Sequence, residues 1–324
     1  MRRRTLRLLA GLLVLGGHRP AAAQASRLDS IRTDDAVLAL IRPLGWEYAA
    51  AVLGDSAVSA YRPYRNTRFA VRGGQTWCKA DFDGNGRTDL LVLARRADIP
   101  LVFCVLDMGG SRLRAVRSFY NAVHRRQPTA QVVYRRGQAL LRYTDFARRR
   151  GSNGRLRNRH TQLLAYTYGA FLPVQRRPTR HRIEAIRLTW KLTYHDHEEL
   201  DLRIEPDDRA YLQTTEYPVL APQQISRQAL TTQLDSACRA DMAGLLNYVR
   251  FSRCRNQYDG GDLNHHPRVE LTITYDGGRT KTIRDANGEG TPGLEYVYTY
   301  LVGLRRSQRW QPTTASDDHV APPR

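Results

Sequence analysis

The sequence predicts an α+β fold in two domains: a β-rich N-terminal module built on an antiparallel sheet, and a smaller α+β C-terminal domain. The length of 324 residues predicts about two domains, because a domain usually holds about 100–200 residues. Residues 89–174 form short apolar or alternating runs separated by Gly, Pro, Arg and Asn, which is typical of antiparallel strands. Beyond residue 182, strand patterns surround helical patterns without regular β-α-β alternation, and this order favours α+β.

The first 25 residues have the composition of a secretory signal peptide. Four arginines near the start precede a short apolar core at residues 8–15, and residues 21–25 offer small-x-small cleavage sites. We therefore expect an exported protein, located in the periplasm or outside the cell. The apolar core is too short to span a bilayer, and no later stretch reaches about 20 apolar residues, so we expect no transmembrane anchor.

Residues 26–176 are predicted to form the β-rich module. Thr33 precedes an amphipathic run that ends at residue 41, which predicts a short helix with Thr33 as its N-cap. The Gly-containing segments 108–111 and 135–138 are predicted to be hairpin turns. The strands expected in this module are residues 90–93, 101–106, 113–119, 131–134, 139–143 and 163–174.

Residues 177–312 are predicted to form the α+β domain. The polar and proline-containing segment 175–181 is the predicted linker. The final segment, residues 313–324, is rich in Pro, Thr, Ser and Asp and is predicted to be a disordered tail. Between them we expect a strand at 182–194, a hairpin around 205–208, a helix at 226–249, a hairpin at 269–283 and a helix at 293–308.

One loop has the pattern D-x-D-x-N-G-x-x-D, which indicates a specific chemistry. Calcium takes six to eight oxygen ligands, and positions 1, 3 and 5 of a tight loop can direct carboxylate or amide oxygens toward one point. Asp81, Asp83 and Asn85 stand at those positions. Arg87 would give its backbone carbonyl, and Asp89 would complete the shell. We therefore predict a Ca²⁺ site with a structural role; the alternative is an Asx-rich turn without a metal.

The loop is not an EF-hand, because Val92 stands where that motif has Glu, and a strand rather than a helix is expected to follow. With Ala80 before it and Leu90-Leu91-Val92 after it, the loop resembles the repeat signature of the FG-GAP/VCBS family, which occurs in integrin-type β-propellers and in many exported bacterial proteins. The sequence has no second full copy, so we expect a single module and not a full propeller. The resemblance implies calcium bound by Asp81, Asp83, Asn85, the Arg87 carbonyl and Asp89.

The C-terminal half is similar to an uncharacterised domain family of exported bacterial proteins. The similarity lies in residues 182–187, 200–204 and 269–278, and in Trp310 after the last predicted helix. In this sequence, residues 192–199 replace the Cys-x-x-Cys-Pro-like segment that the family usually carries. The family has no assigned activity, so the resemblance implies no catalytic or cofactor-binding residue.

The positive charge is concentrated in the middle of the chain. The formal net charge is +20, and only three of the 51 basic residues are lysine. Residues 112–182, the Arg-rich segment, hold 18 basic residues and one acidic residue. The segment is either a polyanion-binding face, for polysaccharide or DNA, or a solvated rim whose composition follows from arginine-biased codon usage. We favour the rim, and we do not expect a nucleic-acid partner.

Four cysteines in an exported chain can form two disulfides. The pairing of Cys78 with Cys104 and of Cys238 with Cys254 respects the predicted domain boundary. The alternative is that some of these cysteines are buried thiols.

The function that the sequence favours is that of an exported, non-enzymatic binding or structural protein with one stabilising calcium loop. The sequence does not identify the partner; an envelope polysaccharide and another envelope protein are the two candidates. One alternative is polyanion binding through residues 112–182. Another, from a different class, is a cell-envelope hydrolase whose acid/base pair comes from Asp196, Glu198, Asp201 or Glu216.

Overall fold

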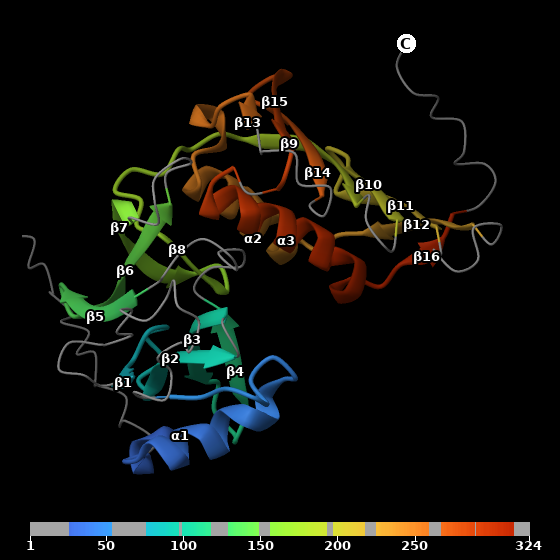
Figure 1. Cartoon of the computed structure of the whole chain (residues 1–324). Coiled ribbons are helices and arrows are strands. Elements are labelled where there is room, and N and C mark those ends of the chain that lie inside the picture. Colours follow the sequence, from blue (N-terminus) through green and yellow to red (C-terminus); the bar gives the residue numbers. More distant parts are fainter. Residues whose placement is uncertain are drawn as a thin grey trace, which may run out of the picture.

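In the computed structural model the described residues form three sheets, and none of these sheets closes into a barrel or propeller (Figure 1). The structure describes residues 26–53, 76–96, 99–117, 129–148, 156–192, 197–217, 225–258, 267–288 and 290–313. The predicted signal peptide and residues 314–324 of the predicted tail lie outside this part. Nearly all strand pairs are antiparallel, which confirms the predicted β-rich, antiparallel character.

The first sheet is buried on both faces. Its order is β1 (Trp77–Ala80), β2 (Asp89–Arg96), β3 (Ile99–Asp107) and β4 (Leu113–Arg117). Helix α1 (Asp34–Ile41) and the 3-10 turns η1 (Arg27–Ser30) and η2 (Arg42–Leu44) precede it in the chain. Leu90 and Val92 of β2 pack with Val37 of α1, while Leu91 faces the second sheet. This explains why β2 is a continuous apolar run rather than an alternating one.

The second sheet packs against the first. Its order is β5 (Thr129–Arg135), β6 (Gln138–Arg148), β7 (Leu156–Thr167) and β8 (Ala170–Pro173). The prediction of one strand over 163–174 is wrong, because the chain reverses between β7 and β8. Tyr168 and Gly169 both have left-handed backbone angles, with φ of 52° and 84°, as a two-residue hairpin turn requires.

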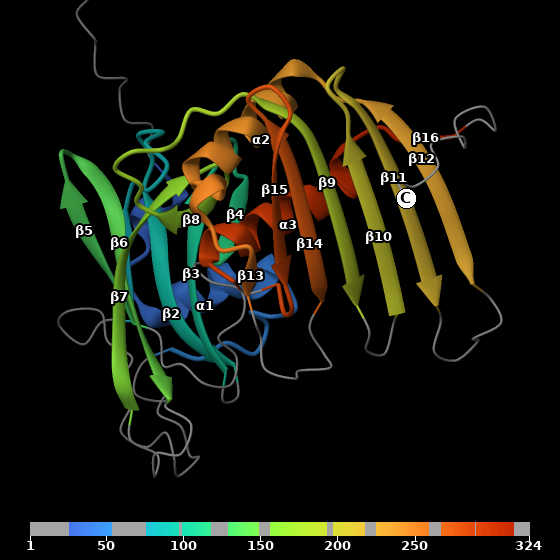
Figure 2. The same cartoon turned by 90° about the horizontal axis from the view of Figure 1, so that it is seen from above.

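The third sheet has eight strands in the order β13-β15-β14-β9-β10-β11-β12-β16, and helices α2 (Ser236–Tyr248) and α3 (Pro292–Ser307) cover one face of it (Figure 2). A 3-10 turn, η5 (Phe251–Arg253), follows α2. The strands are β9 (Ile183–Leu192), β10 (His197–Ile204), β11 (Arg209–Tyr217), β12 (Ser226–Gln233), β13 (Gln257–Tyr258), β14 (Arg268–Tyr275), β15 (Arg279–Asp285) and β16 (Gln311–Pro312).

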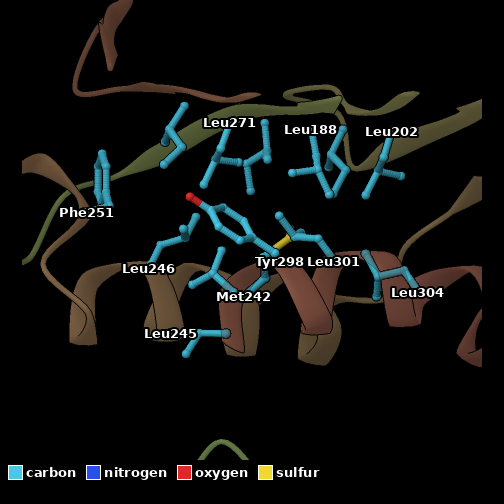
Figure 3. Packing of buried hydrophobic residues seen from close by; sticks show 14 of the residues in the cluster. Leu188, Leu202, Met242, Leu245, Leu246, Phe251, Leu271, Tyr298, Leu301 and Leu304 are labelled. Atoms are coloured by element: carbon cyan, nitrogen blue, oxygen red, sulfur yellow. The ribbon is translucent and has the colours of Figure 1, made fainter. Parts of the chain in front are cut away.

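The core under this sheet follows from alternation along the strands. Leu188, Leu202 and Leu271 point from neighbouring strands toward the helices, where Met242 of α2 and Leu301 of α3 meet them (Figure 3). The residues between them carry polar side chains, and cross-strand ion pairs form there. The sheet is therefore buried on its helix side and solvated on the other.

The predicted helix over 226–249 is wrong in its first third. Residues 226–233 form β12, which pairs along its length with β11, and the helix begins only at Ser236. Asp235 is the N-cap, since its side chain accepts a hydrogen bond from the Cys238 N–H at 2.6 Å. Thr231 and Thr232 are β-branched and suit a strand, so pairing with β11 outweighs the helical spacing of the apolar residues.

The structure does not confirm a clean division of the chain at residue 176. Ala170 and Leu172 of β8 belong to the core of the third sheet, and Tyr296 of α3 donates a hydrogen bond to the Tyr168 carbonyl. The predicted linker is held in place as well. The backbone N–H of His181 donates to the Asn247 side chain at 2.8 Å, and the Arg182 N–H donates to Asp276 at 2.8 Å.

All four cysteines are free in the structure. Cys78 on β1 and Cys104 on β3 both pair with Leu91 on β2, so one strand separates them. Two strand spacings place their Cα atoms roughly 10 Å apart, which exceeds the limit of about 7 Å for a disulfide. The pairing of Cys78 with Cys104 is therefore incompatible with this sheet, and Cys104 is a fully buried thiol.

Within the part of the chain that the structure describes, no helix is long and apolar enough to cross a membrane.

Candidate metal centre

The predicted calcium loop connects β1 to β2. Ala80, the last residue of β1, pairs with Asp89, the first residue of β2, so the two ends of the loop lie side by side. Gly84 and Gly86 have φ of 74° and 78°, and these left-handed angles allow the chain to reverse within a few residues. The loop therefore folds back on itself and brings distant positions of the motif together.

Three carboxylates converge in this loop. Asp81, Asp83 and Asp89 each offer an oxygen that lies within 4.8 Å of the corresponding oxygens of the other two. Calcium binds oxygens at about 2.3–2.6 Å, so two ligands on opposite sides of one ion are roughly 5 Å apart. The observed spacing therefore fits one calcium ion at the centre of the three groups.

Hydrogen bonds from the loop backbone orient these carboxylates. Asp81 accepts hydrogen bonds from the N–H groups of Gly84 and Gly86 at 2.8 and 2.9 Å. Asp83 accepts one from the Asn85 N–H at 3.1 Å. A carboxylate oxygen has two lone pairs, so one N–H contact fixes its direction and still leaves a lone pair for a cation.

Asp89 is fully buried and is held on both sides. Its two oxygens accept hydrogen bonds from the backbone N–H groups of Phe82 and Asp107, at 2.8 and 2.9 Å. Burial raises the pKa of this carboxyl to about 7, and the nearby charges of Asp83 and Asp81 add to that rise. Burial and the charge of Asp81 also raise the pKa of Asp83. A cation among these groups would offset both the desolvation and the repulsion.

The other two predicted ligands, Asn85 and Arg87, are not part of the carboxylate cluster, although the Asn85 side chain donates a hydrogen bond to Asp83 at 3.0 Å. The Asn85 side chain accepts a hydrogen bond from the Arg87 N–H at 2.8 Å and donates one to the Asp107 carbonyl at 2.9 Å. The Arg87 guanidinium lies against Gly109, where an added Cβ would come within 3.2 Å of it. Arg87 is therefore anchored on the β3–β4 turn.

Two residues of this region had no signal in the sequence. The side chain of Asp107, from the end of β3, accepts a hydrogen bond from the Gly109 N–H at 2.8 Å. Its other oxygen lies 2.6 Å from the hydroxyl of Ser26, which also lies 3.0 Å from the Thr88 carbonyl. Ser26 and Asp107 thus connect the loop to the N-terminal segment and to β3. Only the folded sheet brings these two residues next to the loop.

The donor set fits a hard cation. The described side chains that face the loop centre offer carboxylate oxygens, with no sulfur or imidazole among the clustered ligand atoms. Such a set suits calcium better than zinc or copper. If a calcium ion is bound, Asp81, Asp83 and Asp89 would hold it, and it would supply positive charge that neutralises the cluster.

No protein-family model matches the chain. A search of curated proteins also finds no relative. The resemblance to the FG-GAP/VCBS repeat therefore depends on the residues of this loop, and the function has to be argued from the structure.

The carboxylates considered for a hydrolase are engaged with arginines. Arg305 of α3 bridges Glu198 on β10 and Glu216 on β11. Asp201 lies 2.9 Å from the guanidinium of Arg187 and 3.2 Å from that of Arg203. Asp196 lies outside the described residues. Each of the three described carboxylates thus has an arginine partner: Asp201 is paired with arginines of β9 and β10, and Glu198 and Glu216, which lie opposite each other on β10 and β11, share Arg305.

Three side chains that could act in hydrolysis are joined by hydrogen bonds at the C-terminal end of the predicted linker. His181 Nε2 lies 3.0 Å from the hydroxyl of Ser252, and His181 Nδ1 lies 2.6 Å from a carboxylate oxygen of Asp276. The imidazole also makes edge contacts with the rings of Phe251 and Tyr275. His181 is 71 positions from Ser252 and 95 positions from Asp276, so no local motif could reveal this arrangement.

Two cavities lie where the second sheet meets other elements. One, of about 220 Å³, lies between β4, β8 and α3 and contains both arginines and glutamates, including the Arg117–Glu47 pair at 3.3 Å. The other, of about 590 Å³, lies between the β5–β6 turn, β7, the segment after β8, and the end of α2. Among the described residues that line the second cavity, the charged ones are all arginines.

Proposed function

We propose that this is an exported calcium-binding protein that acts by binding a ligand, with the ion in a structural role. The convergence of Asp81, Asp83 and Asp89 within 4.8 Å supports the calcium site. The site is integrated into the core, because Phe82 lies between two of the ligands and is itself buried. An ion here would connect the two ends of the loop and fix the start of β2.

The proposed organisation is a β-rich, FG-GAP/VCBS-like module over residues 26–176, followed by an α+β domain over 177–312. Export is proposed from the signal-like residues 1–25, and a calcium role agrees with it. Extracellular modules bind calcium with dissociation constants of about 10⁻⁴–10⁻³ M, which suit a calcium-rich exterior. At tenfold saturation, such a site would stabilise the fold by about 1.4 kcal/mol.

The test is thermal unfolding of the mature chain in calcium and in chelator, for the wild type, Asp83→Asn and Asp207→Asn. Asp83→Asn keeps a side-chain oxygen for the Asn85 N–H and removes one charge from the site. Asp207→Asn is the matched control, because Asp207 accepts a hydrogen bond from the Arg209 N–H in an exposed turn. Calcium should raise the melting temperature of the wild type and the control and leave Asp83→Asn nearly unchanged. Equal melting temperatures of the wild type with and without calcium would reject the site.

The chain of hydrogen bonds from Ser252 through His181 to Asp276 supports a second candidate function, hydrolysis of an ester or amide. A hydroxyl within hydrogen-bond reach of an imidazole that a carboxylate orients is the arrangement of a serine nucleophile and its base. In this reaction the Ser252 oxygen would attack the acyl carbon while His181 takes the hydroxyl proton and passes it to the alcohol or amine that leaves; water, deprotonated by His181, would then hydrolyse the acyl-Ser252 ester, release the acid and restore the serine hydroxyl.

A fluorophosphonate probe separates the two candidates, since it reacts with activated serines. A hydrolase should be labelled at one serine per chain, and Ser252→Ala and His181→Asn should abolish the labelling while Ser236→Ala keeps it. If the hydrogen bonds among Ser252, His181 and Asp276 are purely structural, we expect no more labelling than in the unfolded protein.

A further inference from the structure

The larger cavity has an unbalanced positive charge. Arg135, Arg136 and Arg176 line it together with Tyr166 and Tyr248, and none of the described residues that line it is acidic. None of the three arginines has a salt-bridge partner within the described part of the chain. In this they differ from Arg187 and Arg305, which are paired with carboxylates. The cavity therefore presents three guanidinium groups without counter-charges.

The fold fixes the backbone positions from which these three exposed arginines project. Arg135 ends β5, and Arg136 begins the tight turn to β6 with a left-handed φ of 51°. Arg176 follows β8 in the segment that leads to the third sheet. The neighbouring Gln175 donates its backbone N–H to the Tyr248 hydroxyl at 3.4 Å, which joins this segment to the end of α2. The cavity wall thus combines three segments that are far apart in sequence.

The tyrosines give the cavity uncharged polar groups beside the arginines. Burial raises the pKa of Tyr166 and of Tyr248, so both hydroxyls stay protonated at neutral pH. Their partly buried rings also provide apolar surface. Sites for small organic ligands usually have volumes of about 300–1,000 Å³ and combine apolar walls with a few polar groups. The volume of about 590 Å³ falls in that range and exceeds the need of one inorganic ion.

We infer that this cavity binds a small organic anion that carries two or more sulfate, carboxylate or phosphate groups. Guanidinium groups bind such oxyanions through paired, charge-assisted hydrogen bonds, and three of them favour a ligand with several anionic groups. The inference rests on the proposed ligand-binding role and names the ligand class for it. It does not depend on the calcium loop, whose residues do not line the cavity.

The experiment is isothermal titration of the mature, calcium-loaded protein at about 0.15 M NaCl, where long-range attraction is screened. The probes are sucrose octasulfate, trigalacturonate and inorganic sulfate. The two saccharides distinguish sulfate from carboxylate as the recognised group. The test variant is Arg135→Gln/Arg136→Gln/Arg176→Gln. The control, Arg227→Gln/Arg306→Gln/Arg309→Gln, removes the same charge from exposed positions on β12 and after Arg305.

We expect at least one saccharide to bind at one site, at least ~10-fold tighter than inorganic sulfate, because several guanidinium groups act on one ligand. The cavity variant should weaken that binding by at least ~10-fold, and the control by less than ~2-fold. Equal losses in both variants would assign the binding to net charge and overturn the inference. Failure of both saccharides to bind, or equal affinity for inorganic sulfate, would overturn it as well.

The calcium response of the same samples separates this inference from the calcium proposal. If calcium raises the melting temperature of the wild type but neither saccharide binds, the inference about the cavity is refuted and the calcium site is retained. If a saccharide binds at the cavity but calcium does not change the melting temperature, only the proposed calcium site is refuted.

Discussion

Replacement of Asp89 by Ala should destabilise the protein strongly even without calcium. The carboxylate accepts hydrogen bonds from the backbone N–H groups of Phe82 and Asp107, and all three residues are buried. Alanine would leave both donors without an acceptor. An unsatisfied buried donor costs about 1–3 kcal/mol, so the free energy of unfolding should fall by about 2–6 kcal/mol. That loss is a large part of the roughly 5–15 kcal/mol of a typical domain.

Urea unfolding in the presence of chelator measures this loss, because chelator removes any contribution from a bound ion. Asp89→Asn keeps one oxygen acceptor and turns its amide group toward the other N–H, so it should cost about half as much, roughly 1–3 kcal/mol. Asp207→Ala, in an exposed turn, should stay within about 0.5 kcal/mol of the wild type. If Asp89→Ala were as stable as Asp207→Ala in chelator, the carboxylate would not hold the two strands, and the structural basis of the site would be wrong.

Three further predictions concern the core, a turn and pH. Leu271→Ala, at a fully buried position in β14, should cost about 2–5 kcal/mol in urea unfolding, whereas Thr272→Ala on the other face should cost less than about 1 kcal/mol. Gly169→Ala should cost at least about 1 kcal/mol by the same assay, because φ is 84° and the new Cβ would lie 3.1 Å from the Tyr296 hydroxyl; no loss would contradict the turn. Hydrogen bonds from His181 and the Arg182 N–H lower the pKa of Asp276, so the stability that they add is present above the unfolded pKa and disappears as the pH falls through the folded pKa. The difference in melting temperature between the wild type and Asp276→Asn should therefore be present at about pH 6 and shrink as the pH falls below the ordinary Asp pKa of about 4, and a difference that stays constant in acid would refute this cause.

The sequence predicted those elements whose structure is decided by neighbouring residues. Thr33 caps α1 as expected, because its side chain accepts a hydrogen bond from the Ala36 N–H at 3.2 Å. The turn between β14 and β15 lies at Asp276, Gly277 and Gly278, where all three residues adopt positive φ. A cap and a tight turn need only a few adjacent residues of suitable chemistry, and such patterns are visible in a sequence.

The errors occur where distant strands decide the structure. The sequence predicts residues 226–233 as the start of a helix because Leu230 continues the apolar spacing of the helix that follows, yet these residues pair with β11 and extend the third sheet. The reversal at Tyr168 and Gly169 lacks the Asn-Gly or Asp-Gly pair that marks such turns, and Tyr168 accepts its left-handed angle because its carbonyl and ring are held by Tyr296 and Tyr248. Those partners come from helices 80 or more positions away, as the separation of 128 between Tyr168 and Tyr296 illustrates.

The same distinction applies to the candidate sites. The clustering of carboxylates was predictable because nine consecutive residues supply them, and the structure brings Asp81, Asp83 and Asp89 together; calcium binding there stays a prediction. Asp107 joins them only through the pairing of β2 with β3. The arginines of the larger cavity appeared in the sequence as part of a general basic excess. Their proposed role depends on the lack of carboxylates among the described residues of the cavity wall, which only the fold defines.

The loop should also affect the stability of the C-terminal sheet, because packed side chains connect the two. Phe82 lies between two proposed ligands and meets the ring of Phe171 on β8, with 5.4 Å between the ring centres. The next residue of β8, Leu172, belongs to the core under the third sheet. Calcium should therefore raise the temperature of one cooperative unfolding transition that includes both halves. Differential scanning calorimetry in calcium and in chelator tests this, and Phe82→Ala, which removes the ring contact, should split or broaden the transition. Two separate transitions in the wild type, of which calcium shifts only one, would show that the halves unfold independently.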